Sequence, residues 1–147
     1  VPGVVPVWAG NDIRGVCCFG DLLSEAMKAR GCVGVVVDGG VRDLAYLKTL
    51  ELPMMVRYRT PAQAIGRWRV TGSQVVIRVR GALEDWVEVK PGDTVVADDD
   101  GVIILPAALV NKIEAQVVQW AEKDSRARKD IRLGTPLLEA LDKYGHL

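Results

Sequence analysis

Three charged residues near the start of the chain have types and a spacing that could bind a small anion and a metal ion. Asp21 precedes a helix-like segment, while Arg42 and Asp43 follow a short apolar run. Free backbone N–H groups at a helix start suit a carboxylate or phosphate, and open α/β sheets bind ligands at the carboxyl ends of their strands. An aspartate there can hold a hard divalent ion whose other positions stay open to water and substrate oxygens.

An ordinary structural explanation competes with this one. Asp21 could cap its own helix, Asp43 could cap the next helix, and Arg42 could pair with either carboxylate. Helix caps are far commoner than ligand sites, so the residues considered by themselves favour capping.

The elements that must position these residues are a helix and a strand. The period of "GDLLSEAMKARG" predicts a helix over residues 22–30, with Gly31 suited to its end. The unbroken apolar run "CVGVVVD" predicts a strand covered on both faces, in a parallel or mixed sheet. Asp38, Gly39 and Gly40 are predicted to form the turn at its carboxyl end.

The rest of the chain completes an α/β pattern. A strand is predicted over residues 4–8, a turn-rich connection over 9–15, a helix from residue 42 towards Pro53, and a strand over 54–59. Short antiparallel or mixed strands follow up to Pro106, which opens a helix to about Lys129. Thr135 is the expected N-cap of a last helix, with Pro136 at its first position.

Two other motifs receive structural interpretations. "ADDDG", residues 97–101, lacks the spaced oxygen ligands of a calcium loop and predicts a tight hairpin turn. Arg67, Arg69, Arg78 and Arg80 near Trp68 could suggest a nucleic-acid surface, but strand alternation places every second side chain in solvent. With 19 basic and 19 acidic residues, the chain has no net charge to attract polyanions.

The composition narrows the chemistry further. The single histidine, His146, excludes an HExxH zinc site and argues against a Ser-His-Asp arrangement. Cys17, Cys18 and Cys32 form no CxxC pair and are expected to be buried thiols. No glycine-rich nucleotide loop occurs, and no apolar run is long enough to span a bilayer. Carboxylates, arginines and a metal remain as the means of catalysis, in a cytoplasmic protein that binds neither membrane nor nucleic acid.

The sequence resembles the RraA-like family, which includes metal-dependent 4-hydroxy-4-methyl-2-oxoglutarate aldolases. The signature of these enzymes is an Asp, twenty residues, then Arg-Asp, and Asp21, Arg42 and Asp43 reproduce it. The blocks "VKPGDTVVADDDGVIILP" and "RLGTPLLEALDKYG" extend the resemblance over most of the chain.

The resemblance implies a compact α/β/α-type sandwich of the swivelling β/β/α kind, with a mixed sheet and C-terminal helices. Residues 1–147 would form a single domain that lacks the family's N-terminal segment. Family members assemble as homotrimers or homohexamers with the site near a subunit interface. A neighbouring chain's glutamate can contribute there, and Glu122 is a candidate counterpart.

The resemblance also assigns roles to individual residues. Asp43 would ligate Mg²⁺ or Mn²⁺, and Arg42 would contact the keto or enolate oxygen. The backbone amides of Gly20, Asp21, Leu22 and Leu23 would hold the pyruvyl carboxylate, while Asp21 would assist proton transfer. The implied enzyme is a class II pyruvate aldolase, a lyase that cleaves 4-hydroxy-2-oxo acids and decarboxylates oxaloacetate through the same enolate.

Two alternatives stand beside this enzyme. Some family members are non-catalytic regulators of ribonuclease E that act through protein contacts. Others have been labelled methyltransferases, although the missing glycine-rich cofactor loop counts against that activity here. The connections at residues 8–18 and 59–70 differ from the family's commonest versions, which leaves the particular oxo acid open.

Overall fold

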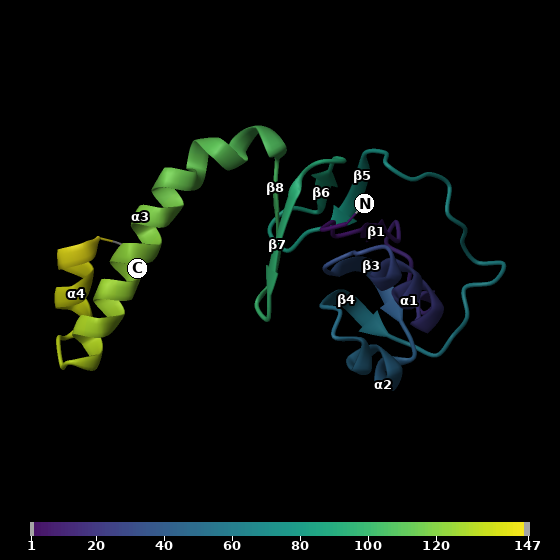
Figure 1. The fold of residues 1–147 in the computed structure, drawn as a ribbon, viewed down its shortest axis with the longest axis horizontal. Coiled ribbons are helices and arrows are strands. Elements are labelled where there is room, and N and C mark those ends of the chain that lie inside the picture. Colours follow the sequence, from purple (N-terminus) through teal and green to yellow (C-terminus); the bar gives the residue numbers. More distant parts are fainter. Residues whose placement is uncertain (1, 146–147) are drawn as a thin grey trace. The chain divides into compact units, whose positions relative to one another are not determined.

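The computed structural model describes residues 2–145, so His146 lies outside the described part of the chain. The fold divides into two units, the first ending at Pro106 and the second beginning at Ala107. The first unit contains strands and two short helices, and the second contains two helices (Figure 1). The predicted α/β class with C-terminal helices is confirmed.

A four-stranded parallel sheet is the centre of the first unit. Its strands are β1 (Val7–Ala9), β2 (Cys17–Phe19), β3 (Val35–Val41) and β4 (Met54–Arg59). Strand β3 pairs with all three others, first with β1 and then with β2. Because β4 pairs with the same β3 residues as each of them, β1 and β2 share one edge of β3 and β4 occupies the other.

The turn predicted at Asp38, Gly39 and Gly40 is wrong, because β3 continues through these residues to Val41. The two glycines serve close packing. A Cβ on Gly39 would lie 2.9 Å from Cys18 Sγ, and one on Gly40 would lie 2.5 Å from Tyr58 Cε2 and 2.7 Å from the Val16 carbonyl oxygen. Strand β2, which supplies part of this packing, was not predicted.

The predicted helix over residues 22–30 is confirmed as α1 (Asp21–Ala29). The helix expected after residue 42 is short, comprising α2 (Leu44–Leu47) and a 3₁₀ turn, η1 (Lys48–Leu50). Lys28 donates a hydrogen bond to the Leu50 carbonyl and so ties α1 to this turn.

The core of the first unit is apolar and includes β3. Trp8 contacts the rings of Phe19 and Trp68 edge to face, at centroid distances of 5.5 and 5.7 Å. The connection after β4 therefore contributes a packed ring, although Arg67 and Arg69 on either side of it are exposed as predicted. The buried members of the core are Cys18, Phe19, Val35, Val37, Val41, Leu47, Leu50 and Leu52.

Two antiparallel hairpins follow, so strands of both kinds occur but in separate sheets. Strand β5 (Ile77–Arg80) pairs with β6 (Trp86–Val89), and β7 (Thr94–Asp98) pairs with β8 (Gly101–Leu105). The Asp100 N–H donates to Asp98 Oδ1 at 2.9 Å within the second turn. The hairpin predicted from "ADDDG" is thus confirmed.

The second unit consists of α3 (Ala107–Arg132) and α4 (Leu137–Tyr144). Asp130 of α3 accepts hydrogen bonds from Lys143 Nζ at 2.7 Å and from the Tyr144 hydroxyl at 2.8 Å. Pro136, rather than the predicted Thr135, occupies the N-cap position of α4. Within residues 2–145, no helix combines the length and apolar character needed to cross a bilayer.

The substitution Gly40→Ala should destabilise the fold by about 1–3 kcal/mol, because the new methyl group would overpack the sheet. The nearest atoms belong partly to the backbone, which cannot rotate away. Urea unfolding measures the effect. Gly34→Ala is the matched control, since the nearest atom to its Cβ would be the Pro53 carbonyl oxygen at 3.4 Å, an ordinary contact distance. Equal midpoints for the two variants would contradict the prediction.

Candidate active site

The start of α1 and the end of β3 come together in the structure. Gly20 has an extended backbone at the N-cap of α1, and the Arg42 N–H donates to the Phe19 carbonyl at 3.2 Å. The Asp21 N–H donates to Asp43 Oδ2 at 3.3 Å. The structure therefore brings together the three residues of the predicted constellation, which the sequence separates by about twenty positions.

Glycine at position 20 allows this close approach. A Cβ there would lie 2.8 Å from Asp43 Oδ2 and 3.4 Å from Arg42 Nε. Any side chain would therefore displace the aspartate from the start of the helix. Gly20 thus keeps the first amide of α1 accessible to an acidic group.

Asp43 does not cap its own helix through its side chain. Its backbone is in the left-handed conformation, with φ of 62°, and its carbonyl rather than its carboxylate accepts from the Tyr46 and Leu47 N–H groups. A non-glycine residue in this conformation carries a backbone cost of about 1 kcal/mol, and such residues concentrate at functional sites. The capping explanation offered for Asp43 is therefore not what the structure shows.

The Asp43 carboxylate instead pairs with Arg42, with 3.2 Å between Oδ2 and Nε. The two side chains are 34% and 39% exposed, so solvent screens the pair and it contributes little stability. Its value lies in the placement of a cation and an anion beside a helix start. Asp43 Oδ1 has no hydrogen-bond donor among the described residues and is available as a ligand atom.

Asp21 lies at the first position of α1, and its Oδ1 accepts from the Leu22 N–H at 2.7 Å. Two amides of the predicted carboxylate cradle, those of Asp21 and Leu22, are thus engaged by the carboxylates of Asp43 and Asp21. A substrate carboxylate would bind these amides only by replacing those oxygens. The Leu22 and Leu23 side chains point away from the core and are exposed.

A pocket of about 490 Å³ opens beside these groups. Arg42 and Asp43 line it, whereas Gly20 to Leu23 are not among its lining residues. Its other walls come from the ends of β3 and β4, including Arg59 and Thr60. Sequence reasoning missed both residues, although their place after a predicted strand was a usable signal, because parallel strands end at one edge.

The donor set fits a hard divalent ion only through Asp43. Among residues 2–145, no group of three or more His, Cys, Asp or Glu side chains could hold a metal. One partly exposed carboxylate beside a pocket suits an ion such as Mg²⁺, which usually keeps several waters and takes only one or two carboxylates. Glu122 lies in the second unit and pairs with Arg126 at 3.3 Å, so its role as a neighbouring chain's ligand stays a prediction.

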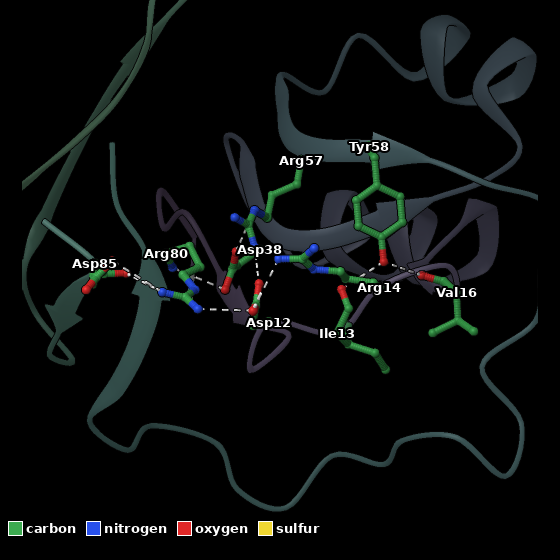
Figure 2. A network of polar contacts seen from close by, with 9 residues as sticks. All are labelled: Asp12, Ile13, Arg14, Val16, Asp38, Arg57, Tyr58, Arg80 and Asp85. Carbon is green, nitrogen blue, oxygen red and sulfur yellow. Dashed lines mark hydrogen bonds and ion pairs between the residues drawn. The ribbon is translucent and has the colours of Figure 1, made fainter. Parts of the chain in front are cut away.

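A second group of charged side chains, here called the Asp38 network, consists of Asp12, Asp38, Arg57 and Arg80 and links the parallel sheet to β5 (Figure 2). Asp38 of β3 is 3% exposed and pairs with Arg57 of β4, with 3.2 Å between Oδ1 and Nε. Arg57 and Arg80 both reach Asp12 at 3.1 Å, and the Arg80 N–H donates to Asp38 Oδ2 at 3.4 Å. Arg80, expected on a solvated face, is therefore part of this network.

The pKa values of the two carboxyl groups in the network, Asp38 and Asp12, are shifted in opposite directions. Burial raises the pKa of Asp38, although the Arg57 guanidinium opposes that rise. The hydrogen bond from Arg80 lowers the pKa of Asp12. The Tyr58 hydroxyl, which lies 2.9 and 3.1 Å from the Ile13 and Val16 carbonyls, holds the adjoining loop, and burial raises its pKa. These contacts anchor the strands that end at the pocket.

Comparisons with known proteins agree on one family for this chain. The family model described as RraA-like, Aldolase/RraA, matches residues 1–104. A Thermus thermophilus protein named 4-hydroxy-4-methyl-2-oxoglutarate aldolase is 33% identical over 70% of this chain and 58% of its own length. The chain likewise spans 54% of a relative from Halalkalibacterium halodurans, so it covers little more than half of these curated relatives.

Solved structures agree with this fold. A Pseudomonas syringae pv. tomato protein matches with a TM-score of 0.88 and 25% identity, covering 98% of this chain and 66% of that one. Streptomyces coelicolor RraAS2, described as an unusual member of the RNase ES inhibitor RraA family, matches with a TM-score of 0.66 and 31% identity. That match covers 86% of this chain and 63% of RraAS2.

Replacing Arg57 by Met should lower the free energy of unfolding by about 2 kcal/mol at neutral pH, because the buried Asp38 carboxylate loses a hydrogen-bonding partner. The pKa of Asp38 then rises further, so the folded protein holds a proton that the unfolded protein has lost. Stability therefore falls as pH rises from 3.8 through the raised pKa of Asp38, and the deficit shrinks on acidification. Urea unfolding at several pH values measures this.

Arg78→Met is the control for that prediction, since it removes an exposed arginine of β5 that has no ion pair among the described residues. It should leave stability almost unchanged at every pH. A deficit in Arg57→Met that did not vary with pH would contradict the role given to Asp38.

Proposed function

Because this chain belongs to the RraA-like family, we propose that it is a divalent-metal-dependent pyruvate aldolase, a lyase that cleaves 4-hydroxy-2-oxo acids such as 4-hydroxy-4-methyl-2-oxoglutarate. One observation carries the proposal. Asp43 turns its carboxylate away from its own helix and towards Arg42 and the start of α1, beside an open pocket. Capping of α2 leaves that conformation unexplained, whereas a site for a metal and a 2-oxo acid would account for it.

Different groups of the chain would have separate roles in the reaction. The first amides of α1 would bind the substrate carboxylate, and Arg42 would hydrogen-bond the 2-oxo oxygen. Asp43 would hold Mg²⁺ or Mn²⁺, which supplies Lewis acidity towards that oxygen. As the C3–C4 bond breaks, negative charge grows on the oxygen, so the Arg42 contact is stronger in the transition state than in the ground state.

Asp21 would handle protons. Cleavage begins with removal of the C4 hydroxyl proton, after which the bonding electrons pass to C3 and form the enolate of pyruvate. Protonation at C3 completes pyruvate, and the other fragment leaves as a carbonyl compound. The position of its carboxylate supports this role, because Asp21 Oδ1 accepts from the Leu22 N–H at 2.7 Å and so lies at the start of α1, beside the proposed carboxylate site.

Oxaloacetate decarboxylation belongs to the same proposal, since loss of CO₂ from oxaloacetate gives the same enolate. The proposal also includes a cytoplasmic protein whose partner is a small 2-oxo acid and which assembles as a homotrimer or homohexamer. The family resemblance supports these parts.

A non-catalytic regulator is the second candidate function. The likeness to RraAS2, a member of an inhibitor family, favours it. A regulator that acts by protein contacts would need neither the metal nor Arg42 for its activity. An assay of turnover therefore separates the two functions.

Substitution of Arg42 by Ala should lower kcat for pyruvate release by about 10² to 10³, the usual cost of losing a preorganised transition-state donor. Pyruvate would be followed from 4-hydroxy-4-methyl-2-oxoglutarate and from oxaloacetate with Mg²⁺ or with EDTA. EDTA should abolish turnover and added Mg²⁺ should restore it. Arg30→Ala, at the far end of α1, is the control.

Metal-independent turnover, or full activity of Arg42→Ala, would refute the aldolase assignment. No turnover by well-folded wild-type protein with Mg²⁺ would favour the regulator instead.

Asp43→Asn should weaken divalent-metal binding at least tenfold, because a neutral amide replaces the charged oxygen ligand. Titration with Mn²⁺, followed by the loss of its free electron paramagnetic resonance signal, measures this without any substrate. Asp99→Asn in the β7–β8 turn removes the same charge from a hairpin and should change nothing. Equal Mn²⁺ affinity for Asp43→Asn and the wild type would exclude Asp43 as the ligand.

A further inference from the structure

Arg59 is a second arginine in the candidate pocket. It ends β4, and its Cα partner in the sheet is Val41, the residue before Arg42. The Thr60 N–H donates to the Val41 carbonyl at 3.0 Å, which extends the pairing past the strand end. Neighbouring strands lie about 4.8 Å apart, so two arginines leave adjacent strand ends into one pocket.

The arginines around this sheet differ in their partners. Arg57 pairs with Asp12 and Asp38, and Arg42 pairs with Asp43. No carboxylate among residues 2–145 pairs with Arg59, which is exposed. The guanidinium of Arg59 is therefore the charge in the pocket lining that the fold leaves uncompensated.

The charged residues that line the pocket do not cancel one another. Arg42 and Asp43 compensate each other, so Arg59 gives the pocket a net positive charge. A guanidinium presents parallel N–H donors that match a carboxylate bidentately. In the proposed function, the substrate's first carboxylate goes to the α1 amides, which leaves Arg59 for a different anionic group.

We propose that Arg59 is a specificity-determining residue that binds the second carboxylate of the substrate and so selects 2-oxo diacids over 2-oxo monoacids. This role rests on the proposed aldolase function, because the orientation of the substrate comes from the α1 amides and Arg42. Arg59 takes no part in bond breaking.

The two proposed reactions should use this contact differently. In aldol cleavage the second carboxylate stays on the departing fragment, so the contact persists in the transition state and contributes to kcat/KM. In oxaloacetate decarboxylation that carboxylate becomes CO₂, and its charge moves to the enolate. Arg59 then stabilises the ground state more than the transition state, which lowers KM without raising kcat.

The test compares 4-hydroxy-4-methyl-2-oxoglutarate with 4-hydroxy-4-methyl-2-oxopentanoate, in which a methyl group replaces the second carboxylate. Both release pyruvate, together with a second pyruvate or with acetone. In the full protein with Mg²⁺, Arg59→Met should lower kcat/KM for the diacid about 10- to 100-fold, as expected for a lost charged hydrogen bond. The monoacid should change less than about threefold on the same basis.

Three further measurements sharpen the test. Arg59→Met should raise KM for oxaloacetate while kcat is maintained or increased. Arg59→Lys should recover part of the diacid preference, because it keeps the charge but loses the bidentate geometry. Arg78→Met, which removes an arginine from β5 outside the pocket lining, should leave the ratio of the two kcat/KM values at the wild-type level.

The outcomes separate this inference from the function on which it rests. Wild-type turnover of the diacid with an unchanged substrate ratio in Arg59→Met would overturn the role of Arg59 and leave the aldolase intact. An equal loss on both substrates would also overturn it, since that result indicates a general structural effect. If the wild type turned over neither the diacid nor the monoacid, the aldolase function and this role would both be overturned.

Discussion

The backbone pairing of β3 is the constraint on which the candidate site depends. This strand is hydrogen-bonded along both edges, to β1 and then β2 on one side and to β4 on the other. All of these pairings are parallel, so the strands end at the same edge. The start of α1 follows β2, Arg42 follows β3, and Thr60 follows β4. Main-chain hydrogen bonds, rather than contacts among the site's side chains, therefore bring the pocket residues together.

The Asp38 network fixes the register of that pairing. A strand that slips by one residue turns every side chain to the opposite face, which would separate the buried Asp38 from Arg57. An unpaired carboxylate in the core is costly, so the mispaired arrangement is disfavoured more strongly than apolar packing by itself would achieve. Gly39 and Gly40 also favour the observed register, because only residues without a side chain fit against Cys18 and Tyr58.

Sequence reasoning succeeded where the signal was local. The period of α1, the extent of β4 and the Asp-Gly turn of the last hairpin all follow from neighbouring residues. It failed at Gly39 and Gly40, where two glycines look like a turn until Cys18 and Tyr58 are seen against them. The proximity of Asp21, Arg42 and Asp43 was predicted, whereas Arg59 needed the strand order, because its place beside Val41 is set by sheet pairing. The left-handed backbone conformation of Asp43 could not be predicted from the fact that the residue is an aspartate.

The contacts of Asp43 suggest how the site can be complementary to a carboxylate while holding a metal ligand. Its Oδ2 already lies on the first amide of α1 and on the Arg42 guanidinium. A substrate carboxylate at that amide and a 2-oxo oxygen at that guanidinium would each replace the aspartate oxygen as acceptor, so neither donor is left without a hydrogen-bond partner. The displaced aspartate, still negatively charged, is then the natural ligand for the cation. Arg59 has no such internal substitute, so in the role proposed for it the anionic partner comes with the substrate.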